Sequence, residues 1–326
     1  MAAPPSSIAA NIPKDLKRSD PHTFNPATDI PSQTGKVILI TGANAGIGKQ
    51  TALELAKHGP AQLWIAARNE ASGKEAVEEI KKVAPKVDVR FVPCDLTSFD
   101  LVQGAAKTVL NGSEKLDVLI LNAGIMGGKP GLTTEGYEKQ FGTNHVGHVL
   151  LLKLLLPVLH RTAKSTEKPP RVIFTSSRGH KAALPPGGIV FDTLKSAQLD
   201  ISGISKYTQS KLANVVYARQ VAKHYPDIVT VAIHPEDVAT QLFSKGAVGG
   251  ESEVEYLARE IAPQVGVTVE EGAKNGLWAA TAEDVESGRY YEPVGIVGNG
   301  SELSKDEEFG RKLWEWTQKE LDGVEV

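Results

Sequence analysis

The stretch KVILITGANAGIG, residues 36–48, joins a continuously apolar run to a glycine-rich turn and the start of a helical pattern. Its glycines fall at positions 42, 46 and 48, with the spacing G-x-x-x-G-x-G. Between a buried strand and an amphipathic helix, backbone N–H groups at the helix N-terminus can hold a pyrophosphate. Glycines permit the tight turn and the close approach of the backbone. Glycine-rich turns are common, so this interpretation depends on the rest of the chain.

Short β-rich runs alternate with helical patterns along the chain. The runs are KVILIT (36–41), LWIAA (63–67), VRFVPCD (89–95), LDVLILNAG (116–124), RVIFTSS (171–177), IVTVAIHP (228–235) and GRYYEPVG (288–295). Several are apolar at every position, which is typical of strands covered on both faces. Repeated β-α-β units predict an α/β fold, a doubly wound parallel sheet of the Rossmann type with helices on both faces, in a single domain over residues 35–322.

Three segments depart from this alternation. Residues 1–34 carry six prolines, which predicts an extended arm. Residues 178–205 and 236–270 are irregular and contain glycine-rich or proline-rich stretches. Both follow strands at the edge where open α/β sheets bind ligands. We therefore expect these two segments to line the substrate site.

Composition and charge argue against several classes of partner. The formal net charge is −3 and no block of Lys or Arg stands out, so no nucleic-acid partner is expected. The single cysteine, Cys94, allows no internal disulfide and suits a reducing compartment, so a cytoplasmic protein is expected. The most apolar run, VLLLKLLLPVL (149–159), is too short to span a bilayer and contains Lys153 and Pro157. It predicts a buried helix and no membrane partner.

The end of the second β-rich run bears on the choice of cofactor. A protein that binds NAD usually has an acid here, which bonds the ribose 2′-hydroxyl. This chain has Ala67 and Arg68 instead. An arginine can pair with a 2′-phosphate through its planar fork, so the sequence favours NADP(H) over an exposed arginine without a ligand.

The strongest chemical signal lies in YTQSKLANVVYARQ (207–220). Tyr207 and Lys211 are four residues apart and would share one face of a helix. A nearby ammonium lowers the pKa of a tyrosine from about 10, so the phenol can act as a general acid or base near neutral pH. A Y-x-x-x-K pair alone is more often a solvated helix face. The glycine loop at 42–48 adds weight to the catalytic interpretation.

Seven motifs occur in the order found in the short-chain dehydrogenases/reductases, and residues 35–320 resemble that family. The motifs are TGANAGIG (41–48), CDLTS (94–98), LNAG (121–124), TNHVGH (143–148), FTSSRGH (174–180), YTQSK (207–211) and HPEDVAT (234–240). Within the family, the chain is most similar to retinol-dehydrogenase-like enzymes and fungal secondary-metabolism reductases. The segments that carry this likeness are NHVGHVLLLKLLLPVL (144–159), YTQSKLAN (207–214) and LWEW (313–316).

The resemblance implies four catalytic residues. Tyr207 would donate the proton in reduction, and Lys211 would bind the nicotinamide ribose and depress the pKa of Tyr207. Ser177, rather than its neighbour Ser176, would hydrogen-bond the carbonyl oxygen as charge develops. Asn144 would hold a water in a proton relay to Lys211.

The resemblance also implies the residues that contact the cofactor. Val238 and Thr240 would contact the carboxamide end of nicotinamide, and Asp95 and Leu96 would contact adenine. The others are Thr41, Gly42, Asn44, Gly46, Ile47 and Gly48 in the loop, Arg68 after the second strand, Asn122, Ala123 and Gly124 along the fourth strand, and Tyr207 and Lys211.

Two features test the resemblance. Family members commonly have Pro-Gly after the sixth strand, where this chain has Pro235-Glu236. Positive φ at a glutamate would cost roughly 1–2 kcal/mol, so we expect an ordinary loop conformation, with the Glu236 carboxylate facing the nicotinamide end or the substrate mouth. His145 and His148 are three residues apart, but no third metal ligand occurs at a useful spacing. Structural histidines and no metal are expected.

The sequence predicts an NADP(H)-dependent oxidoreductase that reduces an aldehyde or ketone of a hydrophobic small molecule, by analogy a fungal polyketide or related secondary metabolite. Three alternatives stay open: oxidation of a retinoid-like or steroid-like alcohol, a non-redox isomerase or dehydratase that uses the same tyrosine, and a non-catalytic nucleotide sensor. A sensor would need only the dinucleotide loop. The oligomeric state is also open. In the family, helices carrying residues 149–159 and 207–218 often pair in a homodimer, whereas some members with an insertion such as 178–205 are monomers.

Overall fold

The computed structural model describes residues 23–238 and 266–326. Most of the expected substrate segment 236–270, including Thr240, lies outside the described residues, as does most of the expected N-terminal arm. From residue 23 onward the arm packs on the body of the protein, where Phe24 and Ile30 are buried. A one-turn helix, α2 (Pro26–Asp29), separates these two side chains and is capped by Asn25.

The strands form one sheet with the order β3-β2-β1-β4-β5-β6-β7-β8. They are β1 (Val37–Thr41), β2 (Gln62–Ala67), β3 (Asp88–Pro93), β4 (Val118–Leu121), β5 (Arg171–Thr175), β6 (Val229–Ile233), β7 (Tyr290–Glu292) and β8 (Ile296–Val297). All neighbours are parallel except β7 and β8. The chain reverses direction across the sheet between β1 and β4, and open α/β sheets bind ligands outside such a switch point.

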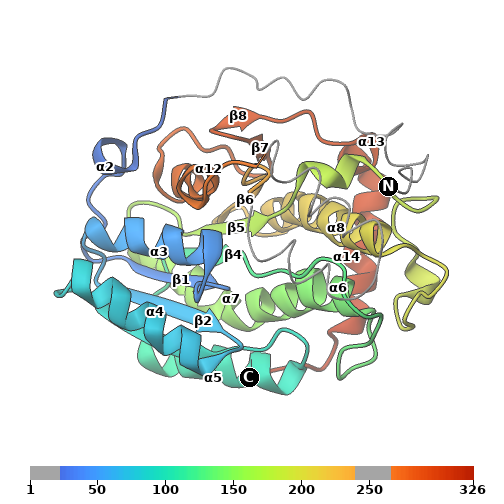
Figure 1. Ribbon diagram of the computed structural model, residues 1–326, viewed down its shortest axis with the longest axis horizontal. Coiled ribbons are helices and arrows are strands. Elements are labelled where there is room, and N and C mark those ends of the chain that lie inside the picture. Colours follow the sequence, from blue (N-terminus) through green and yellow to red (C-terminus); the bar gives the residue numbers. More distant parts are fainter. Residues whose placement is uncertain (1–22, 239–265) are drawn as a thin grey trace, which may run out of the picture.

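Helices cover both faces of this sheet (Figure 1). One face carries α3 (Gly46–Lys57), α4 (Glu70–Val83) and α12 (Val269–Thr281), and the other carries α5 (Phe99–Gly112), α7 (Gly147–Ser165) and α8 (Gly203–His224). Successive side chains of β1 divide between the two cores: Leu39 packs with the α7 layer, and Ile38 and Ile40 with the α3 layer. Burial on both faces explains the continuously apolar strands. The predicted doubly wound parallel sheet is confirmed.

The remaining elements are short, apart from the last helix. They are α6 (Lys139–Phe141), a π-helical turn (Gly142–Val146), 3₁₀ turns at Arg178–Lys181 and Phe191–Thr193, α13 (Glu302–Lys305) and α14 (Glu307–Glu320). Figure 1 shows α14 running beside α8, on the side of the sheet that α5 and α7 cover. Leu313 and Thr317 of α14 are buried there.

The helical stretch Lys139–Ser165 is long and apolar enough, by length and composition alone, to cross a membrane. Within its apolar window 67% is buried inside the protein. Leu150, Leu154 and Leu155 of α7 belong to the core on that face of the sheet. The stretch is packed as a core helix, as expected for residues 149–159.

Candidate active site

The turn after β1 has the geometry that its glycines suggested. Gly42 has φ +68 and Gly46 has φ +55, in the left-handed region that favours glycine. A Cβ on Gly48 would lie 2.5 Å from the Gly42 carbonyl oxygen. The helix α3 begins at Gly46 with Ala45 as its N-cap and no side-chain cap, unlike α4, which Asn69 caps. The first N–H groups of α3 are therefore free of a capping side chain, and they fit a phosphate.

Thr41 ties this turn to the end of β4. Its Oγ1 accepts hydrogen bonds from the backbone N–H groups of Asn122 at 2.9 Å and Ala123 at 3.0 Å. The Asn122 side chain donates to the Thr41 carbonyl at 2.9 Å. These contacts bring the LNAG motif against the glycine loop. The expected cofactor residues at the ends of β1 and β4 therefore lie together at the switch point.

The side chain of Arg68, at the end of β2, is exposed. It makes no hydrogen bond or ion pair within residues 23–238 and 266–326, so its planar fork is available to a ligand. Asn44 of the glycine loop donates to Ser72 Oγ at 2.9 Å, and Ser72 bonds in turn to Asn69 Oδ1. Ser72 and Asn69 are thus polar residues beside Arg68 that sequence reasoning missed. Only the N-cap pattern of α4 could have pointed to them.

The residues expected at adenine are partly engaged within the protein. Asp95 Oδ1 accepts from the Thr97 backbone N–H at 3.0 Å and from its hydroxyl at 2.8 Å. Leu96 is buried, and its carbonyl lies so close to Gly147 that a Cβ there would approach it to 2.4 Å. The conformation of the turn after β3 is therefore held by the hydrogen bonds of Asp95 to Thr97 and by the packing of Leu96 against Gly147 of α7.

Ser177 and Tyr207 meet at the carboxyl end of β5. The Ser177 hydroxyl faces Tyr207 closely enough to lower the pKa of its phenol, and the Ser177 Oγ also caps the 3₁₀ turn by accepting from Gly179 N at 3.0 Å. Ser176 faces the other way: it is buried, and its hydroxyl donates to the Lys211 carbonyl at 2.8 Å. Successive residues of a strand point to opposite sides. Of the two serines, only Ser177 presents its hydroxyl to Tyr207.

Lys211 lies beneath Tyr207. Its Nζ is 5.5 Å from the Tyr207 ring centroid and donates to the Thr175 carbonyl at 3.0 Å. Burial lowers the pKa of Lys211 to about 8. Burial raises the pKa of Tyr207 above its ordinary value, the Ser177 hydroxyl lowers it, and the Asp237 carboxylate raises it. The ammonium lies over the Tyr207 ring, where it can act on the charge of the phenol.

Asn144 occupies the middle of the π-helical turn that precedes α7. Its Oδ1 accepts from Ile125 N at 2.8 Å, and its Nδ2 donates to Ile125 O at 2.9 Å and to Ser210 Oγ at 3.0 Å. A Cβ on Gly124 would lie 3.4 Å from both Asn144 Oδ1 and Lys211 Nζ. The four expected catalytic residues are therefore gathered around one point. π-helical turns are frequent at functional sites, but no local pattern of residues indicated this one.

His145 and His148 hold the π-helical turn in place. His148 Nδ1 bonds to the Asn144 carbonyl at 3.0 Å and its Nε2 to Thr41 Oγ1 at 2.9 Å; since the carbonyl can only accept, Nδ1 carries the proton. Burial lowers the pKa of His148 to about 3 and that of His145 to about 4, so both rings are neutral. Among the described residues, no three His, Cys, Asp or Glu side chains are grouped to hold a metal.

The loop after β6 corrects one expectation. Glu236 has φ +78, so it adopts the left-handed conformation that a glycine would adopt without strain. The ordinary conformation expected for this loop is wrong. The Glu236 carboxylate lies 4.0 Å from Arg178, the residue after Ser177. Val238, expected near nicotinamide, is buried and packs against Gly272 of α12.

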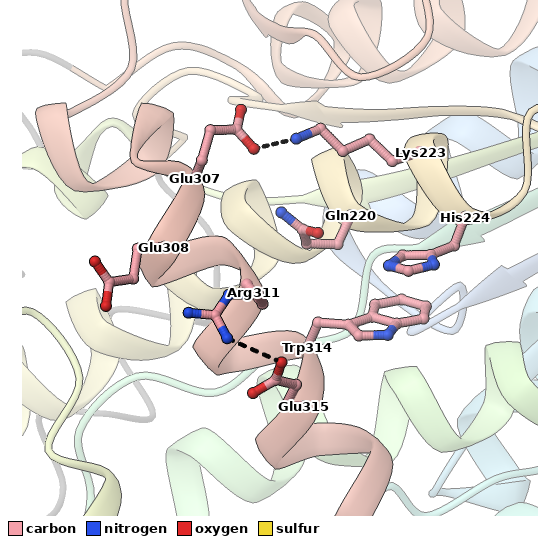
Figure 2. Close-up of a pocket in the computed structure, with 8 residues that line it drawn as sticks. All are labelled: Gln220, Lys223, His224, Glu307, Glu308, Arg311, Trp314 and Glu315. Carbon is pink, nitrogen blue, oxygen red and sulfur yellow. Dashed lines mark hydrogen bonds and ion pairs between the residues drawn. The ribbon is translucent and has the colours of Figure 1, made fainter.

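A groove lies elsewhere, between the C-terminal half of α8 and α14. It is lined by Gln220, Lys223, His224, Glu307, Glu308, Arg311, Trp314 and Glu315. Figure 2 shows the His224 and Trp314 rings face to face, and their centroids are 4.0 Å apart. At 1.5 Å per helical residue, Gln220 is about 13 Å along α8 from Lys211. The groove is thus separate from the cluster around Tyr207.

Comparison with known proteins identifies the family. Residues 36–185 match the family model described as short chain dehydrogenase. A short-chain dehydrogenase/reductase of Armillaria gallica is 34% identical over 89% of this chain and 91% of its own. Human retinol dehydrogenase 12 is 38% identical over 79% of this chain and 77% of its own. A crystal structure of a protein from Mycobacterium Paratuberculosis matches with a TM-score of 0.69 and 29% identity, over 91% of this chain and 96% of its own.

The chain therefore belongs to the short-chain dehydrogenase/reductase family of oxidoreductases.

Proposed function

We propose that the protein is an NADP(H)-dependent reductase that converts an aldehyde or ketone of a hydrophobic small molecule into the alcohol. The observation that carries the proposal is the meeting of three side chains: Lys211 Nζ lies 5.5 Å from the Tyr207 ring centroid, and the Ser177 hydroxyl acts on the Tyr207 phenol. An oxidoreductase acting on a carbonyl needs a proton donor and an oxyanion partner at one point, and these two hydroxyls supply both.

The chemistry divides between the cofactor and the protein. A bound nicotinamide supplies the hydride. Tyr207 gives its phenolic proton to the carbonyl oxygen, while the Ser177 hydroxyl donates a hydrogen bond to the charge that develops there. The Lys211 ammonium stabilises the tyrosinate left behind, and Asn144 belongs to the path that returns a proton to Lys211. The glycine loop and the open N-terminus of α3 would hold the pyrophosphate.

Arg68 supports the choice of NADP(H). Its guanidinium is exposed and unpaired within the described residues, at the end of β2, where a 2′-phosphate would lie. Ser72 and Asn69 add hydrogen-bonding groups beside it. No acid stands at the strand end to receive a ribose 2′-hydroxyl instead.

An apolar wall supports a hydrophobic substrate. The Tyr207 ring packs with Met126 and with Ile204, which is partly buried. The similarity to fungal short-chain dehydrogenases/reductases, including that of Armillaria gallica, supports a fungal polyketide or related secondary metabolite as the substrate class. The similarity to human retinol dehydrogenase 12 favours a second candidate, oxidation of a retinoid-like alcohol at the same site.

We propose a cytoplasmic monomer, with no nucleic-acid or membrane partner. Helix α14 supports the oligomeric state, because it covers outward-facing residues of α7 and α8 that would otherwise be open to a second subunit. Trp314 stacks on His224, Gln318 donates to the Tyr217 hydroxyl at 2.9 Å, and Lys153 of α7 bonds to the Leu321 carbonyl.

The proposed activity can be tested by following NADPH consumption with benzaldehyde, nonanal and all-trans-retinal, with identification of the alcohol formed. The result expected is reduction of at least one of them, faster with NADPH than with NADH. Stoichiometric binding of NADPH without turnover of any of the three would favour the nucleotide-sensor interpretation.

A further inference from the structure

Arg178 lies between two carboxylates that belong to neighbouring segments at the carboxyl edge of the sheet. Its Nη2 is 4.0 Å from Glu236 Oε2, in the loop after β6, and its Nε is 3.6 Å from Glu292 Oε2, at the end of β7. Glu292 Oε1 is 2.6 Å from Lys181 Nζ. These four residues are called the Arg178 cluster below. They link the segments that follow β5 and β6 to β7.

The cluster is poorly hydrated. Its side chains are 16–27% exposed. Beside it lie three buried side chains whose polar atoms find no partner within the described residues: His180 Nε2, both ring nitrogens of His234, and the Tyr290 hydroxyl. Charges in such surroundings are screened less than charges at an open surface. The two carboxylates therefore attract Arg178 more strongly than they would at an open surface.

Glu236 keeps its place in this cluster in a strained conformation. Its φ of +78 would suit glycine. Strained backbone persists only where surrounding contacts hold it, and it concentrates at functional sites. At this position a glutamate brings a carboxylate to Arg178, which glycine could not do.

Arg178 is connected to Ser177 directly through the backbone. Arg178 is the first residue of the 3₁₀ turn Arg178–Lys181, and Ser177 is the N-cap of that turn. The Ser177 carbonyl accepts from His180 Nδ1 at 2.7 Å. The Ser177 hydroxyl in turn accepts from Gly179 N at 3.0 Å, so the placement of the turn bears on the direction of the hydroxyl that faces Tyr207. Asp237, next to Glu236, is a further charge that acts on both Arg178 and Tyr207.

We propose that Arg178 is a positioning residue. Held between Glu236 and Glu292, it fixes the 3₁₀ turn after Ser177 and so aims the Ser177 hydroxyl at the point where Tyr207 delivers its proton. The proposal rests on the proposed reductase function, in which Ser177 meets the developing oxyanion. A misplacement of about 1 Å at such a group can cost as much as 10²-fold in rate.

The kinetic test uses Arg178→Gln, Arg178→Lys and Arg178→Gln combined with Glu236→Gln, with the aldehyde that the protein reduces fastest. We expect Arg178→Gln to lower kcat by about 10-fold or more and to leave the KM for NADPH unchanged, since Ser177 acts in the transition state. Arg178→Lys should recover at least part of the loss. The double variant should lose little more than the single one, because both changes break the same contact. Arg311→Gln, in an exposed ion pair with Glu315, is the control and should match the unmodified protein.

The stability test separates strain from charge. Glu236→Gly relieves the left-handed backbone, whereas Glu236→Gln keeps it and removes the charge. We expect Glu236→Gly to melt at least as high as the unmodified protein and Glu236→Gln to melt lower, while both lose kcat. A merely structural role would make kcat follow the melting temperature. If Arg178→Gln and Glu236→Gly have normal kcat while Tyr207→Phe is inactive, the positioning proposal is overturned and the reductase function stands. If Tyr207→Phe is active, the reductase function itself is overturned.

Discussion

Ser177 faces Tyr207 and lowers the pKa of its phenol, whereas the hydroxyl of the preceding residue, Ser176, is bonded to the Lys211 carbonyl. Ser176 donates to the Lys211 carbonyl and thereby ties β5 to α8. Two adjacent and chemically identical side chains thus have different roles: Ser176 makes a structural hydrogen bond, and Ser177 faces the proton donor. The strand geometry, which points them to opposite sides, makes the division.

Ser177→Ala and Ser176→Ala should therefore have contrasting effects. Loss of Ser177 removes a donor to the developing oxyanion, so kcat should fall by about 10²–10³-fold with little change in the free energy of unfolding. Loss of Ser176 removes a buried hydrogen bond, which should cost about 1 kcal/mol of stability and leave most of kcat. Steady-state kinetics and urea unfolding of both variants measure this. The opposite pattern would mean that Ser176 is the oxyanion donor.

Arg68→Ala should abolish most of the preference for NADPH over NADH. A charge-assisted, bidentate contact with a 2′-phosphate contributes about 1.5–3 kcal/mol, which corresponds to roughly 10- to 100-fold in Kd. Cofactor titration by intrinsic fluorescence measures both dissociation constants. Arg90→Ala is the matched control, because Arg90 is paired with Asp88 on β3. Equal affinities for the two cofactors in the unmodified protein would contradict the assignment to NADP(H).

The stability of the protein without cofactor should depend on pH through Lys211. Burial lowers the pKa of Lys211 from 10.5 to about 8. Between these values the unfolded chain binds a proton that the folded chain has released, so this group's contribution to the free energy of unfolding rises with pH, by about 3 kcal/mol at most.

The measurement compares urea unfolding of the unmodified protein and Lys211→Met at about pH 8 and about pH 10. The unmodified protein should gain stability relative to Lys211→Met over this interval. Relative to Lys82→Met, a substitution at an exposed position of α4, the unmodified protein should show no such gain. Parallel pH profiles for the unmodified protein and Lys211→Met would show that the ammonium is not buried as described.

The protein should behave as a monomer of 34.8 kDa in size-exclusion chromatography with light scattering. The reason is that α14 already packs along α8 and bonds to Lys153 of α7, and Leu313, Thr317 and Leu321 are buried there. A dimer at micromolar concentration would contradict this, because a second subunit could reach those helices only if α14 moved away.

Much of the fold could be predicted from the sequence, because burial on both faces leaves a direct mark on strand composition. Runs such as VILI are apolar at every position, and the helical patterns between them require parallel crossovers. The strand β8 was missed because two residues carry no periodicity. Its neighbour β7 was expected within residues 288–295, and residues 23–34 were expected as an arm although Phe24 and Ile30 are buried.

The sequence predicted which residues form the site better than it predicted how they are arranged. The order of the motifs predicted that Asn144, Ser177, Tyr207 and Lys211 share one site, and the structure places them together. The π-helical turn around Asn144 depends on contacts with Ile125 and Ser210, which no local pattern records. The strain at Glu236 was misjudged, because the energetic argument considered its backbone without the ion pair that the fold supplies.

Tyr207→Phe is the sharpest test of whether Tyr207 donates the proton in carbonyl reduction. The substitution removes one hydroxyl and little volume, so the melting temperature and the Kd for NADPH should be unchanged. Steady-state NADPH consumption with the best aldehyde, with the alcohol product identified, is the measurement. The account predicts a fall of about 10²–10⁴-fold in kcat, the contribution of positioned proton transfer. Turnover by Tyr207→Phe at the rate of the unmodified protein would contradict it.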